Sequence, residues 1–99
     1  MAARKIVWSP FAERKLFAIL EYFTERNKNR TYSLKLYNRF QKQLSALDTN
    51  PDIGVKTNFL TIRGLIVDNY TLYYEVTHEK IIVHILRDNR QDPDELIIR

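Results

Sequence analysis

The sequence predicts an α+β fold in which an antiparallel sheet packs against an N-terminal helical hairpin, in the order β-α-α-β-β-β. Two observations support this prediction. Apolar residues recur at three- and four-residue steps in the first half of the chain, and they alternate with a period of two from Val55 onward. Because 99 residues is the length of one domain, we expect a single domain over residues 1–99.

Two amphipathic helices are expected in the first half. Residues 4–8 form a short strand, and Ser9 and Pro10 then supply an N-cap and a proline at the first helical position. The polar cluster at 27–30 ends this helix, and Pro51 follows the end of the second. The two apolar stripes consist of Ala12, Leu16, Ile19, Leu20 and Phe23, and of Tyr37, Phe40, Leu44 and Leu47.

Three strands are expected in the second half, at residues 61–67, 70–77 and 81–86. Asp68 and Asn69 tolerate the left-handed backbone of a tight turn, so they are expected to join the first two strands as a hairpin.

The composition excludes several classes of protein. With 44% hydrophobic residues, 28% charged residues and only two Gly, the chain has the composition of an ordered globular protein. It contains no Cys, which excludes disulfides and Cys-ligated metals, and we expect no metal and no other cofactor. Its apolar runs are far shorter than the roughly 20 residues that cross a bilayer. We therefore expect no membrane partner and a cytoplasmic location.

The charge is unevenly distributed. The net charge is +4, but residues 1–50 carry ten basic and four acidic side chains, whereas residues 51–99 carry six and eight. A basic half can lie along nucleic acid or against an acidic partner, and the solvated faces of two helices give the same count.

The face of the sheet that the helices leave open is the candidate site. If Tyr70, Leu72 and Tyr74 face the helices, alternation places Tyr73 on the open face. The same reasoning, with Ile62 and Ile66 on the helix side, places Arg63 on the open face. It also places His84 there, together with Ile82 and Leu86, while Arg87 and Arg90 lie at its end.

Several guanidinium groups with a Tyr or a His form a plausible phosphate site. Simpler interpretations remain open, because Arg63 fits a solvated strand cation and His84 a hydrogen-bonded core histidine. A slip of one residue in register would reverse each assignment to a face.

The order of elements and several local strings resemble the RelE/ParE superfamily of bacterial type II toxin–antitoxin systems. The resemblance covers nearly the whole chain. The strings that carry it are Val7-Trp8-Ser9-Pro10 with Ala12, the apolar run of Leu16, Ile19 and Tyr22, Asn50-Pro51, Ile62-Arg63, Ile66-Val67, Asn69 to Tyr74, and Arg87-Asp88-Asn89-Arg90-Gln91-Asp92-Pro93.

The resemblance implies a toxin that a small antitoxin neutralises, and two activities occur in the superfamily. RelE-like members cut messenger RNA in the ribosomal A site, whereas ParE-like members poison DNA gyrase. Arg63 and Arg90 resemble basic positions that serve transition-state charge in the RNA-cutting branch, and Lys56 lies where that branch often has a lysine. RNA-cutting members commonly carry a Tyr, or a His with a Tyr, near the C-terminus, and residues 91–99 contain neither.

Our hypothesis from the sequence is a growth-arresting toxin, and we place ribosome-dependent mRNA cleavage ahead of gyrase inhibition. Arg63, Arg90, Tyr73 and His84 are the candidate catalytic residues, and Lys56 and Arg87 the candidate phosphate-binding residues. The alternatives are a ParE-like gyrase inhibitor without nuclease activity and a degenerate binding partner. An acidic antitoxin segment is expected to pair with a sheet edge and to use the open face.

Overall fold

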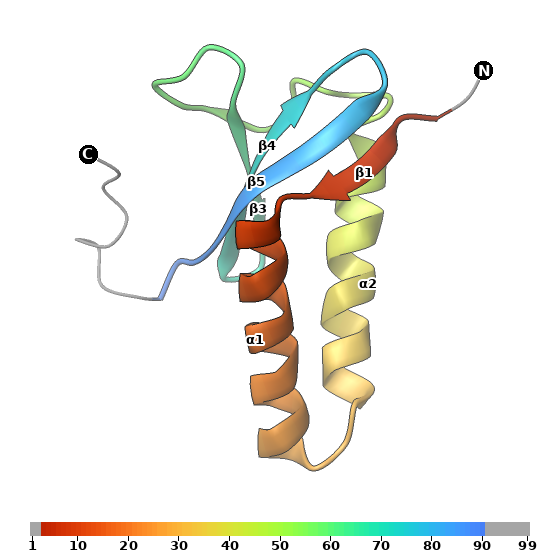
Figure 1. Cartoon of the computed structure of the whole chain (residues 1–99), viewed down its shortest axis with the longest axis vertical. Coiled ribbons are helices and arrows are strands. Elements are labelled where there is room, and N and C mark those ends of the chain that lie inside the picture. The colour runs from red at the N-terminus through yellow and green to blue at the C-terminus, as the bar shows by residue number, and fades with distance from the viewer. Residues whose placement is uncertain (1–2, 91–99) are drawn as a thin grey trace.

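The computed structural model describes residues 3–90. A strand, two helices and four further strands follow one another along the chain (Figure 1). The elements are β1 (Lys5–Trp8), α1 (Pro10–Asn27), α2 (Thr31–Ala46), β2 (Val55–Lys56), β3 (Arg63–Val67), β4 (Tyr70–Val76) and β5 (Lys80–Asp88). The expected helices and strands are confirmed with small shifts at their ends, and β2 is an additional short strand.

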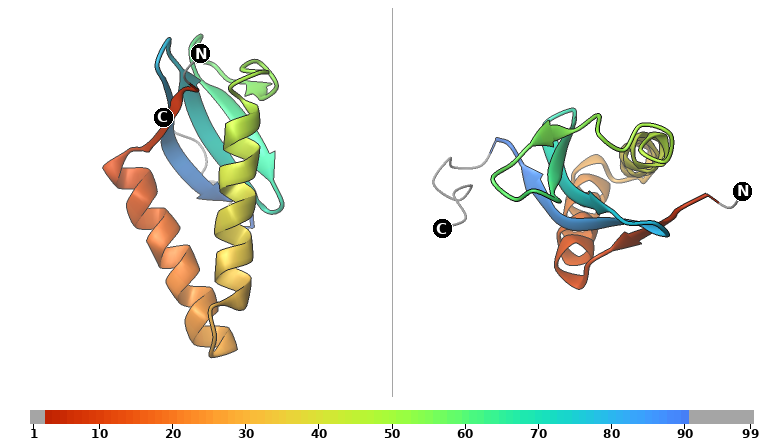
Figure 2. Two further views of the ribbon diagram at one scale, coloured as in Figure 1. Left: turned by 90° about the vertical axis from the view of Figure 1, so that its right-hand side faces the viewer. Right: turned by 90° about the horizontal axis from the view of Figure 1, so that it is seen from above.

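The two helices form an antiparallel hairpin that lies against one face of the sheet and extends beyond it (Figure 2). Ser9 caps α1 as expected, since its Oγ accepts a hydrogen bond of 3.0 Å from the backbone nitrogen of Ala12. Lys28 ends α1 in the left-handed conformation with a φ of 58°. Near this end the hydroxyls of Thr24 and Ser33 lie 2.8 Å apart and tie the helices together. No helix within residues 3–90 is long and apolar enough to span a bilayer.

The sheet has the strand order β1-β5-β4-β3-β2. Neighbouring strands from β5 to β2 are antiparallel, but β1 pairs with β5 in parallel, with Ile6 opposite Ile81. The sheet is therefore mixed, and antiparallel pairing accounts for all of it except this one edge. Parallel neighbours need a long crossover connection, and the two helices with β2, β3 and β4 supply it between β1 and β5 (Figure 1).

The core lies between the hairpin and the sheet. Tyr70, Leu72 and Tyr74 of β4 are buried there, as their alternation predicts. The ring of Phe40 on α2 contacts Tyr70 edge-on at 5.5 Å between centroids and lies 6.4 Å from the ring of Trp8. These aromatic contacts join α2 to both β4 and β1.

The expected orientation of β3 is wrong. Leu65 and Val67 are buried against the helices, whereas Ile66 is 62% exposed on the open face. The two-residue turn fixes this register, because it places Val67 opposite Tyr70 and therefore Arg63 opposite Tyr74. Arg63 thus lies on the helix-covered side of the sheet, whereas Tyr73 is on the open side.

The expected alternation of β5 is also broken, by a β-bulge at His84. Tyr74 pairs with Val83 and Tyr73 with Ile85, so His84 is the extra residue on β5. The bulge shifts the alternation by one residue after this point. Leu86 is 2% exposed, inside the core rather than on the open face, and Ile85 takes the place that was expected for it.

Candidate functional site

A groove of about 480 Å³ lies on the open face of the sheet. Three of the six predicted site residues line it, namely Lys56, Tyr73 and His84. The other lining residues come from β2 to β5 and from the loop between β2 and β3; they are Val55, Thr57, Asn58, Phe59, Ile62, Gly64, Ile66, Thr71 and Ile85. Lys56 is the one lining residue with a permanent charge, so the groove is mainly apolar.

The bulge fixes the position of His84 in this groove. The hydroxyl of Ser9 donates a 2.8 Å hydrogen bond to the carbonyl oxygen of His84, which connects the bulge to the start of α1. The side chain of His84 is held as well, since its Nε2 lies 2.9 Å from Oε1 of Glu75 on β4. This contact with the carboxylate orients the imidazole, and an oriented imidazole is what a general acid or base requires. Glu75 was not among the predicted site residues.

Arg63 is engaged elsewhere, in holding the loop that follows α2. Its Nη1 donates a 3.0 Å hydrogen bond to the carbonyl of Gly54, and its Nε lies 3.5 Å from Oδ1 of Asp52. The buried Tyr74 holds the same loop, since its Oη accepts a hydrogen bond from the Gly54 nitrogen and donates one to Pro51 O. Burial raises the pKa of Tyr74, and the hydrogen bond from Gly54 and the charge of Arg63 oppose that rise.

Arg90 is paired within its own turn. Its Nε and Nη2 lie 3.0 and 3.1 Å from the two carboxylate oxygens of Asp88, and Nη2 also donates to Oη of Tyr70. The hydrogen bond from Arg90 lowers the pKa of Asp88, and burial of Tyr70 raises the pKa of its phenol. The guanidinium is therefore neutralised by a local carboxylate.

Arg87 lies outside the groove as well. It pairs with Thr71 across the sheet, which places it on the open face, and its Nε is buried with no hydrogen-bond partner among the described residues. The structure thus brings Lys56, Tyr73 and His84 together, but it does not bring Arg63, Arg87 and Arg90 to them. The C-terminal segment 91–99, in which an RNA-cutting member would carry a Tyr or His, lies outside the described residues.

Most of the chain matches a known protein family. Residues 6–92 match the family model described as the ParE toxin of the type II toxin–antitoxin system parDE. The chain belongs to this ParE toxin family. A search of curated proteins gives no match.

A solved structure shows the same fold as this ParE-family chain. It carries the description "Chromosomal ParDE TA system from P. aeruginosa", and the similarity covers 87% of this chain and 96% of that one, with a TM-score of 0.69 and 17% identity. The family match confirms the resemblance seen in the sequence, and the solved structure confirms the fold.

Two features of the groove in this ParE-family chain were not predicted from the sequence. Glu75 is the partner of His84, and Phe59 stands on the loop that forms one wall. Strand alternation indicates that Glu75 faces the same side of the sheet as Tyr73, because both occupy odd positions of β4. The role of the loop could have been inferred from the apolar pair Phe59-Leu60, which stands between polar neighbours.

Proposed function

We propose that this ParE-family toxin arrests growth by binding a protein target, DNA gyrase, rather than by cutting RNA. The observation that supports this is the separation of the basic residues. Cleavage by the 2′-OH of RNA needs cations beside the phosphorane-like centre, within reach of the groups that move protons. Arg63 is on the opposite side of the sheet from Tyr73, and Arg90 is paired with Asp88.

The lining of the groove supports the same proposal. Its walls carry Val55, Phe59, Ile62, Ile66 and Ile85, and such apolar surface suits a protein better than a phosphodiester chain, for which each phosphate contact needs a cation. A small antitoxin is the neutralising partner in a type II system. We expect its toxin-binding segment to be acidic, because the first half of this chain carries a net charge of +6 from ten basic and four acidic residues.

One observation favours ribosome-dependent mRNA cleavage as the second candidate. Lys56, Tyr73 and His84 line one groove, so a cation and two groups able to transfer protons share a surface. If these residues were catalytic, replacing His84 with Ala would lower the cleavage rate by about 10²–10⁴-fold.

The test combines purified toxin with DNA gyrase and relaxed plasmid, and in parallel with a translating extract whose messages are mapped for cuts. We expect inhibited supercoiling, cleaved DNA trapped on gyrase and intact messages. The His84→Ala variant should inhibit gyrase as the wild type does, provided that it folds. Cuts at ribosomal A-site codons, lost in the His84→Ala variant and accompanied by unaffected supercoiling, would replace this proposal with the second candidate.

A further inference from the structure

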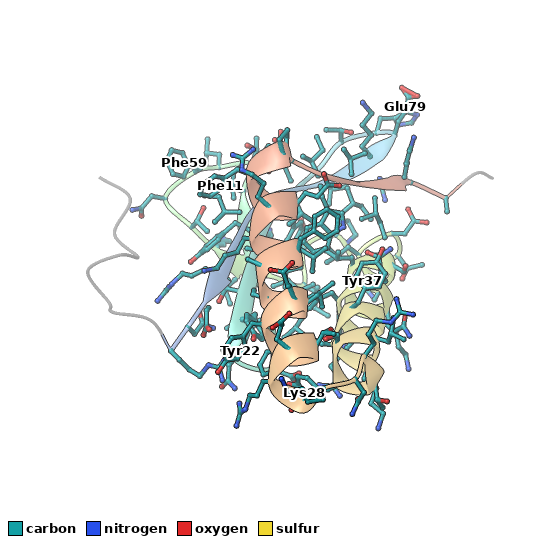
Figure 3. The ribbon with its side chains drawn as sticks, turned by 60° about the horizontal axis from the view of Figure 1, so that its bottom comes forward. Phe11, Tyr22, Lys28, Tyr37, Phe59 and Glu79 are labelled. Atoms are coloured by element: carbon teal, nitrogen blue, oxygen red, sulfur yellow. The ribbon has the colours of Figure 1, made fainter. Side chains whose placement is uncertain are left out.

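The loop between β2 and β3 carries the most exposed apolar side chains of the described chain. Residues 57–62 connect the two strands and stand at the margin of the molecule, where Phe59 projects away from both helices (Figure 3). Leu60 is 102% exposed and Phe59 is 63% exposed. Two adjacent side chains of this kind on one loop are unusual for a surface that contacts only water.

Hydrogen bonds within the loop hold its shape. Oγ1 of Thr57 accepts a 3.1 Å hydrogen bond from the Phe59 nitrogen and donates a 2.7 Å bond to the carbonyl of Ile62. The Ile62 nitrogen in turn donates to the carbonyl of Phe59 at 3.2 Å. These hydrogen bonds restrain the backbone on either side of Leu60, so a partner that binds Phe59 and Leu60 incurs less cost in ordering the loop.

The charges around the loop indicate the chemistry of its partner. Residues 57–62 contain no charged side chain, although the chain has 16 Lys and Arg. A loop that contacted nucleic acid would be expected to contribute cations. Lys56 stands at the base of the loop, is exposed, and has no ion-pair partner among residues 3–90. The partner surface that would match this loop is therefore an apolar protein pocket with a carboxylate at its rim.

We propose that Phe59 and Leu60 form the wedge by which this toxin engages its protein target, inserting into an apolar pocket while Lys56 pairs with an acidic residue beside it. This inference rests on the proposed function, in that the target is taken to be gyrase. It adds the contacting residues and the chemistry of the pocket that receives them. A few well-packed residues near the centre of an interface supply most of its binding energy.

Three variants test the wedge. Phe59→Ser with Leu60→Ser removes both anchors, and Thr57→Val removes the hydroxyl that shapes the loop but keeps the anchors. Phe17→Ser with Leu34→Ser is the matched control, because these residues of α1 and α2 are 58% and 54% exposed. Circular dichroism and thermal unfolding establish that each variant is folded.

Two readouts are measured, the toxin concentration that half-inhibits gyrase supercoiling and the growth arrest on induction in cells without antitoxin. We expect the loop double variant to need at least about tenfold more toxin, Thr57→Val to lie in between, and the control to stay within about twofold of the wild type. Growth arrest should follow the same order.

The two readouts separate failure of the wedge from failure of the proposed target. If the folded loop double variant inhibits gyrase and arrests growth as the wild type does, the wedge is refuted. The wedge is also refuted if the loop double variant and the wild type inhibit gyrase equally while only the loop double variant fails to bind vesicles. That result would indicate that the loop contacts lipid. If the wild type leaves gyrase unaffected while the loop variant alone loses growth arrest, gyrase is wrong as the target and the wedge stands.

Discussion

Arg63 was expected on the open face of the sheet, yet its guanidinium binds the loop that follows α2. Its hydrogen bond to Gly54 O and its contact with Asp52 lie on the helix-covered side of the sheet. Because Asp52 is 85% exposed, the ion pair contributes little, and the hydrogen bond to Gly54 is the main stabilising contact.

Replacing Arg63 with Ala is therefore expected to affect stability more than toxicity. The loss of a charged hydrogen-bond donor to a partly buried carbonyl should lower the free energy of unfolding by about 1–2 kcal/mol. Lys56→Ala, which removes an exposed cation from the neighbouring strand, should change it by less than about 0.5 kcal/mol. Urea titration measures both, and growth arrest by folded Arg63→Ala should persist. A variant with wild-type stability and no toxicity would instead place Arg63 in the site.

Gly54 shows why the same loop accepts no larger residue. A Cβ atom at this position would lie 2.6 Å from Oη of Tyr74 and 3.0 Å from the carbonyl of Gly64. The Tyr74 ring cannot move away easily, since it is buried and its hydroxyl is bonded to both Gly54 and Pro51. Position 54 therefore requires glycine, because the buried Tyr74 ring approaches the loop too closely for a Cβ atom.

The bulge in β5 depends on α1 through a single side chain. Ser9 Oγ accepts a hydrogen bond from Ala12 N, which caps the helix, and donates one to the carbonyl of the extra residue His84. One hydroxyl therefore both begins the helix and fixes the residue that carries the imidazole into the groove.

Two substitutions of Ser9 separate these roles. Ser9→Ala loses both bonds and should lower the free energy of unfolding by about 1–2 kcal/mol. Ser9→Asp keeps an acceptor for the helix cap but has no proton to donate to His84, so α1 should stay protected while the bulge loosens. Hydrogen exchange of the amides around His84 and in the first turn of α1 measures the difference. Equal protection of the His84 region in the wild type and both variants would contradict the link.

The helices and the hairpin turn could be predicted from sequence because each depends on local chemistry. Apolar spacing, the Ser9 cap and the Asp68-Asn69 turn all lie within a few residues of what they determine. The orientation of β3, and that of β5 after His84, could not be predicted in this way. Residues 81–86 are apolar at every position except His84, so their pattern fits either face, and the bulge is bonded to Ser9, 75 residues away in sequence.

The candidate site was predicted in part for the same reason. Tyr73 was placed correctly because β4 alternates cleanly, and His84 because the alternation of β5 holds up to this residue, with Ile81 and Val83 buried. Arg63 was misplaced because the run from Leu65 to Val67 is apolar on both faces, and only pairing with β4 determines which face is buried. Whether these residues act on RNA stays a prediction.

The fold as a whole encloses two tyrosines whose ionisation is linked to unfolding. Tyr70 and Tyr74 are 2% and 1% exposed, and burial raises the pKa of each above its usual value of 10.0. In the unfolded chain both phenols lose their protons near their ordinary pKa, whereas in the folded chain they keep them to higher pH. Because the folded state then binds more protons, the free energy of unfolding is unaffected below pH 10 and falls as the pH rises above it.

Urea titrations of the wild type between about pH 8 and 11 should therefore show a loss of stability above pH 10 that Tyr74→Phe reduces. This variant is less stable at neutral pH, since it lacks the hydrogen bonds to Pro51 and Gly54, but its decline with pH should be shallower by up to about 1.4 kcal/mol per pH unit. All other ionisable groups are common to the wild type and the variant, so the difference between their slopes isolates the buried phenol. A Tyr74→Phe profile as steep as that of the wild type would show that this ring is accessible to hydroxide in the folded protein.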